Sequence, residues 1–154
     1  MSHSNNETAS SEAKMSYIEK FSLEKNEWTV KITGIASRFK NVEDLVDVQV
    51  DLYSERQRAT DYIAQLYVTL AKLKKLHLSE WNKVFNALTN NQDYRYTEKE
   101  KQKIADDKVS EIRIKLDMIQ NHIDYFNGTV KTIDSMIFGV KHRIEIEDFK
   151  RGNK

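Results

Sequence analysis

The feature of this sequence that most restricts its fold is a long apolar repeat in the C-terminal part. Apolar residues recur at intervals of four and three positions, so the period is 3.5 residues over more than five heptads. A straight α-helix would drift off such a stripe by about 20° per heptad. The repeat therefore predicts a long helix that supercoils against partner helices. Its residues are Ala105, Val109, Ile112, Leu116, Ile119, Ile123, Phe126, Val130, Ile133, Ile137, Val140 and Ile144.

A capping signal marks the beginning of this helix. Thr97 is followed three residues later by Glu100, which is the form of a capping box. The signal and the repeat together predict a helix over 97–149, about 70 Å or more in length at ~1.5 Å per residue.

Another long helix is predicted before it. Asn41 is a candidate N-cap, and Glu43 and Asp44 follow where the helix dipole favours acidic side chains, so the helix is expected over 41–88. The polar stretch 89–93 predicts a loop, and two long helices joined by a short loop should form an antiparallel coiled-coil hairpin. The apolar stripe of this helix comprises Ala59, Ile63, Leu66, Leu70, Leu73, His77, Trp81, Val84 and Leu88.

Composition supports an all-α fold. The 154 residues include no proline and four glycines, too few turn residues for an all-β chain. We expect a single helical domain over 15–152 after a disordered tail at 1–14. Within 15–40 the apolar residues keep helical spacing in part, although the sequence around Trp28 alternates like a strand and Gly34 interrupts both patterns. We expect a small helical segment there.

The second long helix has more apolar surface than one hairpin partner covers. Met118, Tyr125, Met136, Phe138 and Ile146 flank the seam, which is mostly isoleucine. Wide apolar flanks indicate contact with more than one helix, so we expect assembly into a helical homo-oligomer. The residues predicted to mediate it are Ile123, Phe126, Val130, Ile133, Ile137, Val140 and Ile144.

Several functional classes find no support in the sequence. There is no cysteine, which fits the cytoplasm, and no apolar run reaches the roughly 18–20 residues of a membrane span. The four histidines include no Glu-x-x-His motif, and there is no nucleophile elbow or phosphate-binding glycine loop. We therefore expect no enzyme, no metal and no cofactor.

A local basic cluster is the best candidate binding site, because the net charge of the whole chain is only +1. Lysines can neutralise phosphates, and aromatic rings beside them can stack on unpaired bases. The alternative is that the lysines only solvate a helix whose Trp81 belongs to the core. The candidate nucleic-acid-binding residues are Lys72, Lys74, Lys75, His77, Trp81 and Lys83, with Tyr94 and Tyr96 as further stacking candidates.

The end of the chain resembles the phage recombination mediator family typified by UvsY. In that family a long helix closes on Phe-x-Ile-Lys-x-x-Ile and then Phe-x-x-Gly. The matching residues here are Phe138, Val140, Lys141, Ile144, Phe149 and Gly152, with valine in place of the first isoleucine.

The resemblance implies a small homo-oligomer that binds single-stranded DNA. Such proteins promote the loading of a recombinase onto strands coated by single-strand-binding protein, and they contact both of those proteins. The family's DNA-contacting basic residues correspond here to Lys72, Lys74 and Lys75. A phage-encoded member would act in the host cytoplasm. The alternative function is a structural coiled-coil assembly or scaffold protein that binds no nucleic acid.

Overall fold

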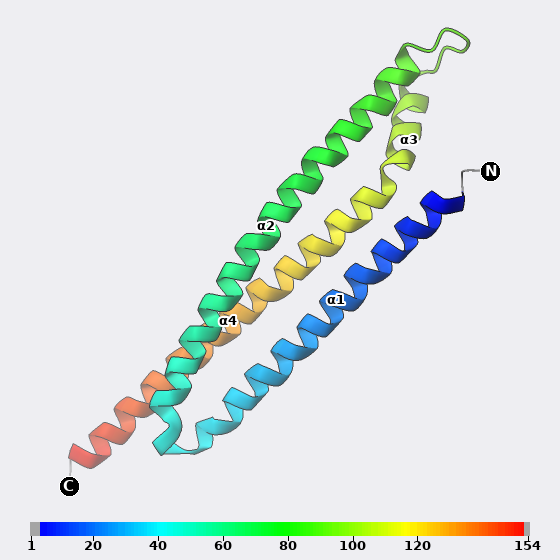
Figure 1. Ribbon diagram of the computed structural model, residues 1–154. Coiled ribbons are helices and arrows are strands. Elements are labelled where there is room, and N and C mark those ends of the chain that lie inside the picture. The colour runs from blue at the N-terminus through cyan, green and yellow to red at the C-terminus, as the bar shows by residue number, and fades with distance from the viewer. Residues whose placement is uncertain (1–3, 153–154) are drawn as a thin grey trace. The chain divides into compact units, whose positions relative to one another are not determined.

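The chain is helical in a computed structural model that describes residues 4–152, with side chains described from Ser16 onward. It contains α1 (Ser4–Ser37), the 3-10 turns η1 (Arg38–Lys40) and η2 (Val42–Asp44), α2 (Leu45–Thr89), α3 (Glu98–Lys108) and α4 (Ser110–Gly152) (Figure 1). No strand occurs in this part of the chain, which confirms the all-α prediction with long helices. None of these described helices is long and apolar enough to cross a membrane.

α1 is much longer than the small segment that was expected over 15–40. It continues through the strand-like alternation and through Gly34. Phe21, Trp28 and Ile35 are seven residues apart and share one helix face, whose burial outweighs the local alternation. Of the tail expected at 1–14, residues 1–3 lie outside the described residues, and the others belong to α1.

The chain divides into two compact units. Unit 1 joins Met1–Ile18 with Leu66–Asn121, and unit 2 joins Glu19–Gln65 with His122–Lys154. Each long helix therefore contributes residues to both units. The prediction of one helical domain over 15–152 stays a prediction.

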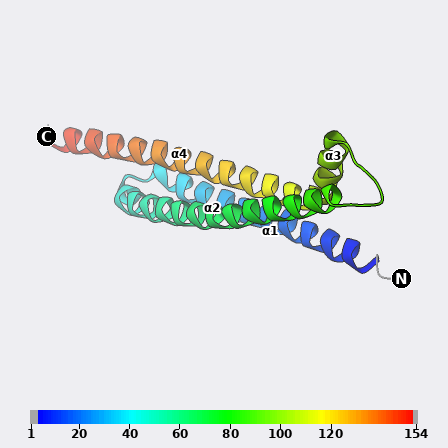
Figure 2. The same ribbon diagram turned by 90° about the horizontal axis from the view of Figure 1, so that it is seen from above.

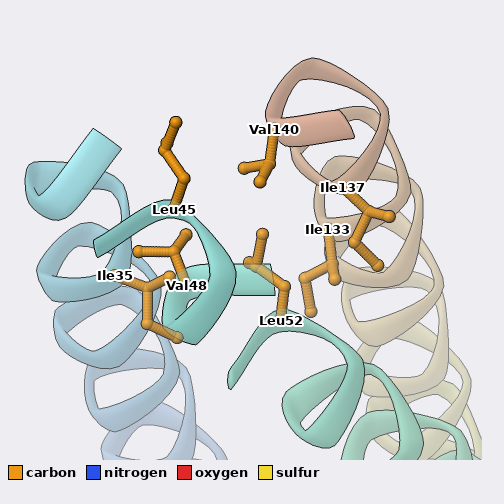
Figure 3. Close-up of a cluster of buried hydrophobic side chains, with 7 residues drawn as sticks. All are labelled: Ile35, Leu45, Val48, Leu52, Ile133, Ile137 and Val140. Carbon is orange, nitrogen blue, oxygen red and sulfur yellow. The ribbon is translucent and has the colours of Figure 1, made fainter. Parts of the chain in front are cut away.

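The core of unit 2 is built from three helices (Figure 3). α1 contributes Ile35, while α2 and α4 contribute three residues each. The third helix explains part of the wide apolar flank of α4, because Trp28 and Met136 also pack against this core. The antiparallel hairpin and its assembly into an oligomer stay predictions. The buried cluster comprises Ile35, Leu45, Val48, Leu52, Ile133, Ile137 and Val140.

Unit 2 also buries a polar side chain, His122, which is 1% exposed. The Nε2 atom of His122 lies 2.8 Å from Oε2 of Glu24, and the hydroxyl of Tyr62 donates to the same oxygen. Phe21 stacks on the His122 ring with centroids 3.9 Å apart. Burial lowers the pKa of His122, against the opposing effect of the Glu24 carboxylate.

The second predicted helix is interrupted at Val109, where α3 ends and α4 follows. Figure 2 shows α3 running in a different direction from the first turns of α4. Val109 leaves helical geometry, with φ −101° and ψ 8°, and the Ser110 hydroxyl donates to the Asp107 carbonyl. The prediction of an unbroken helix over 97–149 was therefore wrong at this point.

The predicted capping box at the start of α3 is confirmed. The Thr97 hydroxyl accepts from the Glu100 amide at 3.2 Å, and the Thr97 amide donates to the Glu100 carboxylate at 2.8 Å. These bonds from Thr97 lower the pKa of Glu100. Asn41 caps η2 rather than α2, and its side chain bonds to Asp44 instead of the backbone.

Candidate nucleic-acid interface

The predicted lysines lie in the unit 1 part of α2, and all of them are exposed. At 3.6 residues per turn, Lys72, Lys75 and Lys83 fall within about 80° of one another around the helix axis. Lys74 lies about 100° or more from each of them, beside the apolar stripe. The structure therefore groups three of the four lysines on one side of the helix.

These three lysines belong to a longer exposed strip. Ser79, Asn86 and Asn90 continue it with steps of three and four residues, and all are exposed. Asn90 follows the last helical residue but keeps helical bonding, since its amide donates to the Asn86 carbonyl at 3.0 Å. We name Lys72, Lys75, Ser79, Lys83, Asn86 and Asn90 the lysine strip; it extends about 27 Å along α2.

Negative charge beside the lysine strip is sparse. Between Leu66 and Asn90 the only acidic residue is Glu80. Glu80 pairs with Lys83, with 3.1 Å between Nζ and Oε1. The strip therefore presents net positive charge, which is greatest at the end that carries Lys72 and Lys75.

His77 and Trp81 do not share the side of α2 that carries the lysine strip. Both are half-buried on the inward apolar stripe. The Trp81 indole donates to Asp106 at 2.8 Å and stacks on Phe85 with centroids 4.9 Å apart. This arrangement favours the interpretation of Trp81 as a packing residue, and its role in base stacking stays a prediction.

The loop after α2 carries the other aromatic candidates. Tyr94 is 55% exposed, whereas Tyr96 is half-buried, and their rings meet edge to face at 4.7 Å. The side-chain oxygen of Asn91 accepts from the amides of Asp93 and Tyr94, at 2.8 Å and 3.2 Å. These bonds stabilise the turn from Asn91 to Tyr94.

Two basic residues near the end of α4, Arg143 and Lys150, make contacts within unit 2. The Arg143 guanidinium donates to the carbonyls of Phe39 and Lys40 in unit 2. Lys150 pairs with Glu147 at 3.3 Å. These contacts make Arg143 and Lys150 weaker candidates for binding phosphates than the lysine strip.

The residues predicted to mediate self-association lie in the interior of unit 2. Ile123, Phe126 and Ile133 are completely buried within the single chain, and Ile137 and Val140 nearly so. Val130 and Ile144 are half-buried. The apolar repeat is therefore used largely for packing within the chain, which the period alone does not reveal.

No group of three potential ligands that could hold a metal occurs among the described histidine and carboxylate side chains. The arrangement that the structure does provide is an exposed basic strip on a helix that leads to an aromatic loop. Such a combination suits an extended polyanion with accessible bases.

Comparison with known proteins identifies the family. The family model described as "Recombination, repair and ssDNA binding protein UvsY" matches residues 44–153. This chain belongs to the UvsY family. The matched segment includes α2, α3 and α4, and therefore the whole lysine strip, whereas α1 precedes it.

Membership of the UvsY family implies a role in recombination and repair and the binding of single-stranded DNA. The description of the family names binding and no catalytic activity. No curated protein and no solved structure matches the chain. The contacts that serve UvsY-type functions in this chain must therefore be inferred from its own residues.

Proposed function

We propose that this protein is a recombination mediator. It binds single-stranded DNA through the lysine strip and promotes loading of a recombinase onto strands coated by single-strand-binding protein. It acts in phage recombination and repair, in the host cytoplasm. The observation that carries the proposal is the group of Lys72, Lys75 and Lys83, exposed on one side of α2 within the family-matched segment.

The lysine strip suits a phosphate backbone for an electrostatic reason. Each phosphate that a lysine neutralises releases condensed counterions, so that log K falls with log salt with a slope of about −0.7 per contact on single strands. Three lysines therefore account for a slope of about −2 per protein chain. Such binding is weak for one chain and becomes strong when several linked copies engage one strand.

Self-association needs an apolar surface other than the interior seam. On α4, Phe138 and Phe149 are 72% and 71% exposed, and Ile146 is 41% exposed. At 3.6 residues per turn these side chains lie within about 80° of one another. We propose that this stripe joins copies of the chain, and Phe138→Ser with Phe149→Ser should lower the mass measured by sedimentation velocity.

The binding proposal is tested by fluorescence anisotropy of a labelled single-stranded oligonucleotide at several salt concentrations. We expect salt-sensitive binding that is tighter than binding to duplex. The variant Lys72→Ala/Lys75→Ala/Lys83→Ala should bind at least tenfold more weakly and lose about 2 from the salt slope. Mediator activity is then measured as faster recombinase filament formation on strands coated by single-strand-binding protein.

A matched control removes the same charge elsewhere in unit 1. Lys99, Lys103 and Lys108 are exposed on α3 and lie outside the strip, so their alanine variant should retain most of the binding. Equal losses in both triple variants would show that net charge, not the strip, drives binding. Absence of binding by the wild-type protein at low salt would overturn the proposal and leave the coiled-coil scaffold as the better account.

A further inference from the structure

A pocket of about 530 Å³ lies in unit 1 beside the loop between α2 and α3. Its lining includes Thr89, Asn90, Gln92, Arg95, Tyr96 and Lys101. This volume falls within the range of about 300–1,000 Å³ that is usual for small-molecule sites. The pocket is therefore large enough for one nucleotide unit.

The pocket is held open by contacts within the chain. Lys101 is only 7% exposed; its Nζ donates to Glu98 at 2.6 Å and to Thr89 at 3.3 Å, and it lies 5.2 Å from the centre of the Phe85 ring. The capping box at Thr97 and the turn at Asn91 fix the two ends of the loop. A site that is formed before binding loses less conformational entropy when a ligand enters.

The lining groups match an unpaired base better than a bare phosphate. The side-chain amides of Asn90 and Gln92 offer both donors and acceptors, as the Watson–Crick edge of a base does. The Tyr96 ring and the Arg95 guanidinium are flat groups on which a base can stack. The lining carries two cations, Arg95 and Lys101, and the charge of Lys101 is paired with Glu98, so a phosphate would gain less here than from two uncompensated cations.

The lysine strip leads directly to this pocket. Asn90 is the last residue of the strip and also lines the pocket. A strand whose phosphates follow Lys72, Lys75 and Lys83 is thereby brought to the pocket rim. We propose that the pocket takes one unpaired base of bound single-stranded DNA, an inference that rests on the proposed function.

The experiment compares two labelled oligonucleotides of equal length and equal phosphate count. One is oligo(dT), and the other carries abasic sugars throughout. With the full-length protein, oligo(dT) should bind about 5-fold to about 150-fold more tightly, the range that stacking of one base supplies. The measured quantity is the ratio of the two dissociation constants.

The pocket variant Asn90→Ala/Gln92→Ala/Tyr96→Ala should bring this ratio close to one and leave the salt slope unchanged. Tyr96→Phe keeps the ring and should keep most of the ratio. Gln102→Ala is the control, because Gln102 is exposed on α3 and does not line the pocket. Circular dichroism confirms that each variant retains its helices.

The outcomes separate this inference from the proposed function. A pocket variant that binds DNA with the wild-type ratio overturns the base pocket and leaves the proposed function standing, as does a wild-type ratio of one. If the wild-type protein binds neither oligonucleotide, the proposed function fails and the base pocket falls with it. The lysine strip variant should weaken binding to both strands while the ratio stays at the wild-type value.

Discussion

Units 1 and 2 draw on the same long helices but use their side chains differently. Among the described side chains, the largest that are fully buried all belong to unit 2 except Ile119. In unit 1 the inward stripe of α2 includes His77, Trp81 and Val84, which are only half-buried. Unit 1 also contains the lysine strip and the loop pocket.

The comparison shows that a regular apolar pattern does not by itself indicate what its residues do. In unit 2 the residues of the repeat pack into a buried core, and α1 contributes to this core as a third helix. In unit 1 the same kind of pattern leaves incomplete burial, and Trp81 donates a hydrogen bond to Asp106. We therefore expect substitution of a buried side chain to cost most in unit 2, and loss of a local contact in unit 1 to cost less.

The largest expected effect tests the packing of unit 2. Phe126 is completely buried and contacts the rings of Trp28, Tyr62 and His122. Phe126→Ala should lower the free energy of unfolding by about 3–5 kcal/mol, because it removes a large buried ring and leaves a cavity. Urea denaturation followed by circular dichroism measures the loss.

A matched substitution at an exposed ring is the control. Tyr53→Ala should change the free energy of unfolding by no more than about 0.5 kcal/mol, because Tyr53 is 46% exposed on α2 in unit 2 and lies outside the stripe proposed to join copies of the chain. Similar losses for the two variants would contradict the assignment of Phe126 to a dense core.

A smaller effect tests the local contacts of unit 1. Thr97→Ala removes the side-chain half of the capping box and should cost about 1 kcal/mol, with a range of about 0.5–2. Hydrogen exchange should increase at the first amides of α3, and that at Glu100 most clearly, because it loses its acceptor. Thr97→Ser keeps the hydroxyl and should protect these amides nearly as well as threonine does; equal exchange in both variants would argue against the cap.

A third effect is confined to mildly acidic solution and concerns His122. Burial lowers the pKa of this residue from 6.5, so the folded chain keeps the imidazole neutral where the unfolded chain takes up a proton. The unfolded state then binds more protons, and the free energy of unfolding falls as the pH drops below about 6.5. The titratable groups that face the ring are Glu24, Tyr62 and Tyr125; the Glu24 carboxylate favours the protonated form, whereas the charges of Lys20 and Lys25 disfavour it.

Denaturant midpoints measured between pH 7.5 and 5.5 test this dependence. His122→Asn should remove most of the slope just below pH 6.5, whatever its effect at neutral pH. His142→Asn is the control, because that side chain is 66% exposed, and it should keep the wild-type slope. A slope that persists in His122→Asn would assign the proton uptake to another group.

The sequence predicted the fold best where a short motif makes specific hydrogen bonds to the backbone. The Thr97–Glu100 box was predicted correctly because hydroxyl and carboxylate bond to specific backbone amides. The break at Val109 was missed, since Ala105, Val109 and Ile112 keep the four-and-three spacing across it. The length of α1 was missed because its face is buried against distant residues, such as Phe126, that short-range patterns do not include.

The candidate site was predictable only in outline. Composition singles out the lysines of α2, but helical geometry is needed to separate Lys74 from Lys72 and Lys75. The loop pocket depends on backbone turns and on the buried position of Lys101, which no spacing in the sequence reveals. The repeat likewise cannot tell whether its partner helix belongs to the same chain; Phe126 and Ile133 are buried within this chain, and their role in self-association stays a prediction.

The two tryptophans of the chain fall one in each unit, Trp28 in unit 2 and Trp81 in unit 1. Trp28 meets the edge of Phe126, whereas Trp81 donates to Asp106. Each unit therefore contains its own intrinsic fluorophore. With Trp28→Phe or Trp81→Phe the remaining emission follows a single unit, so one denaturation series can reveal whether the two halves melt together or in sequence.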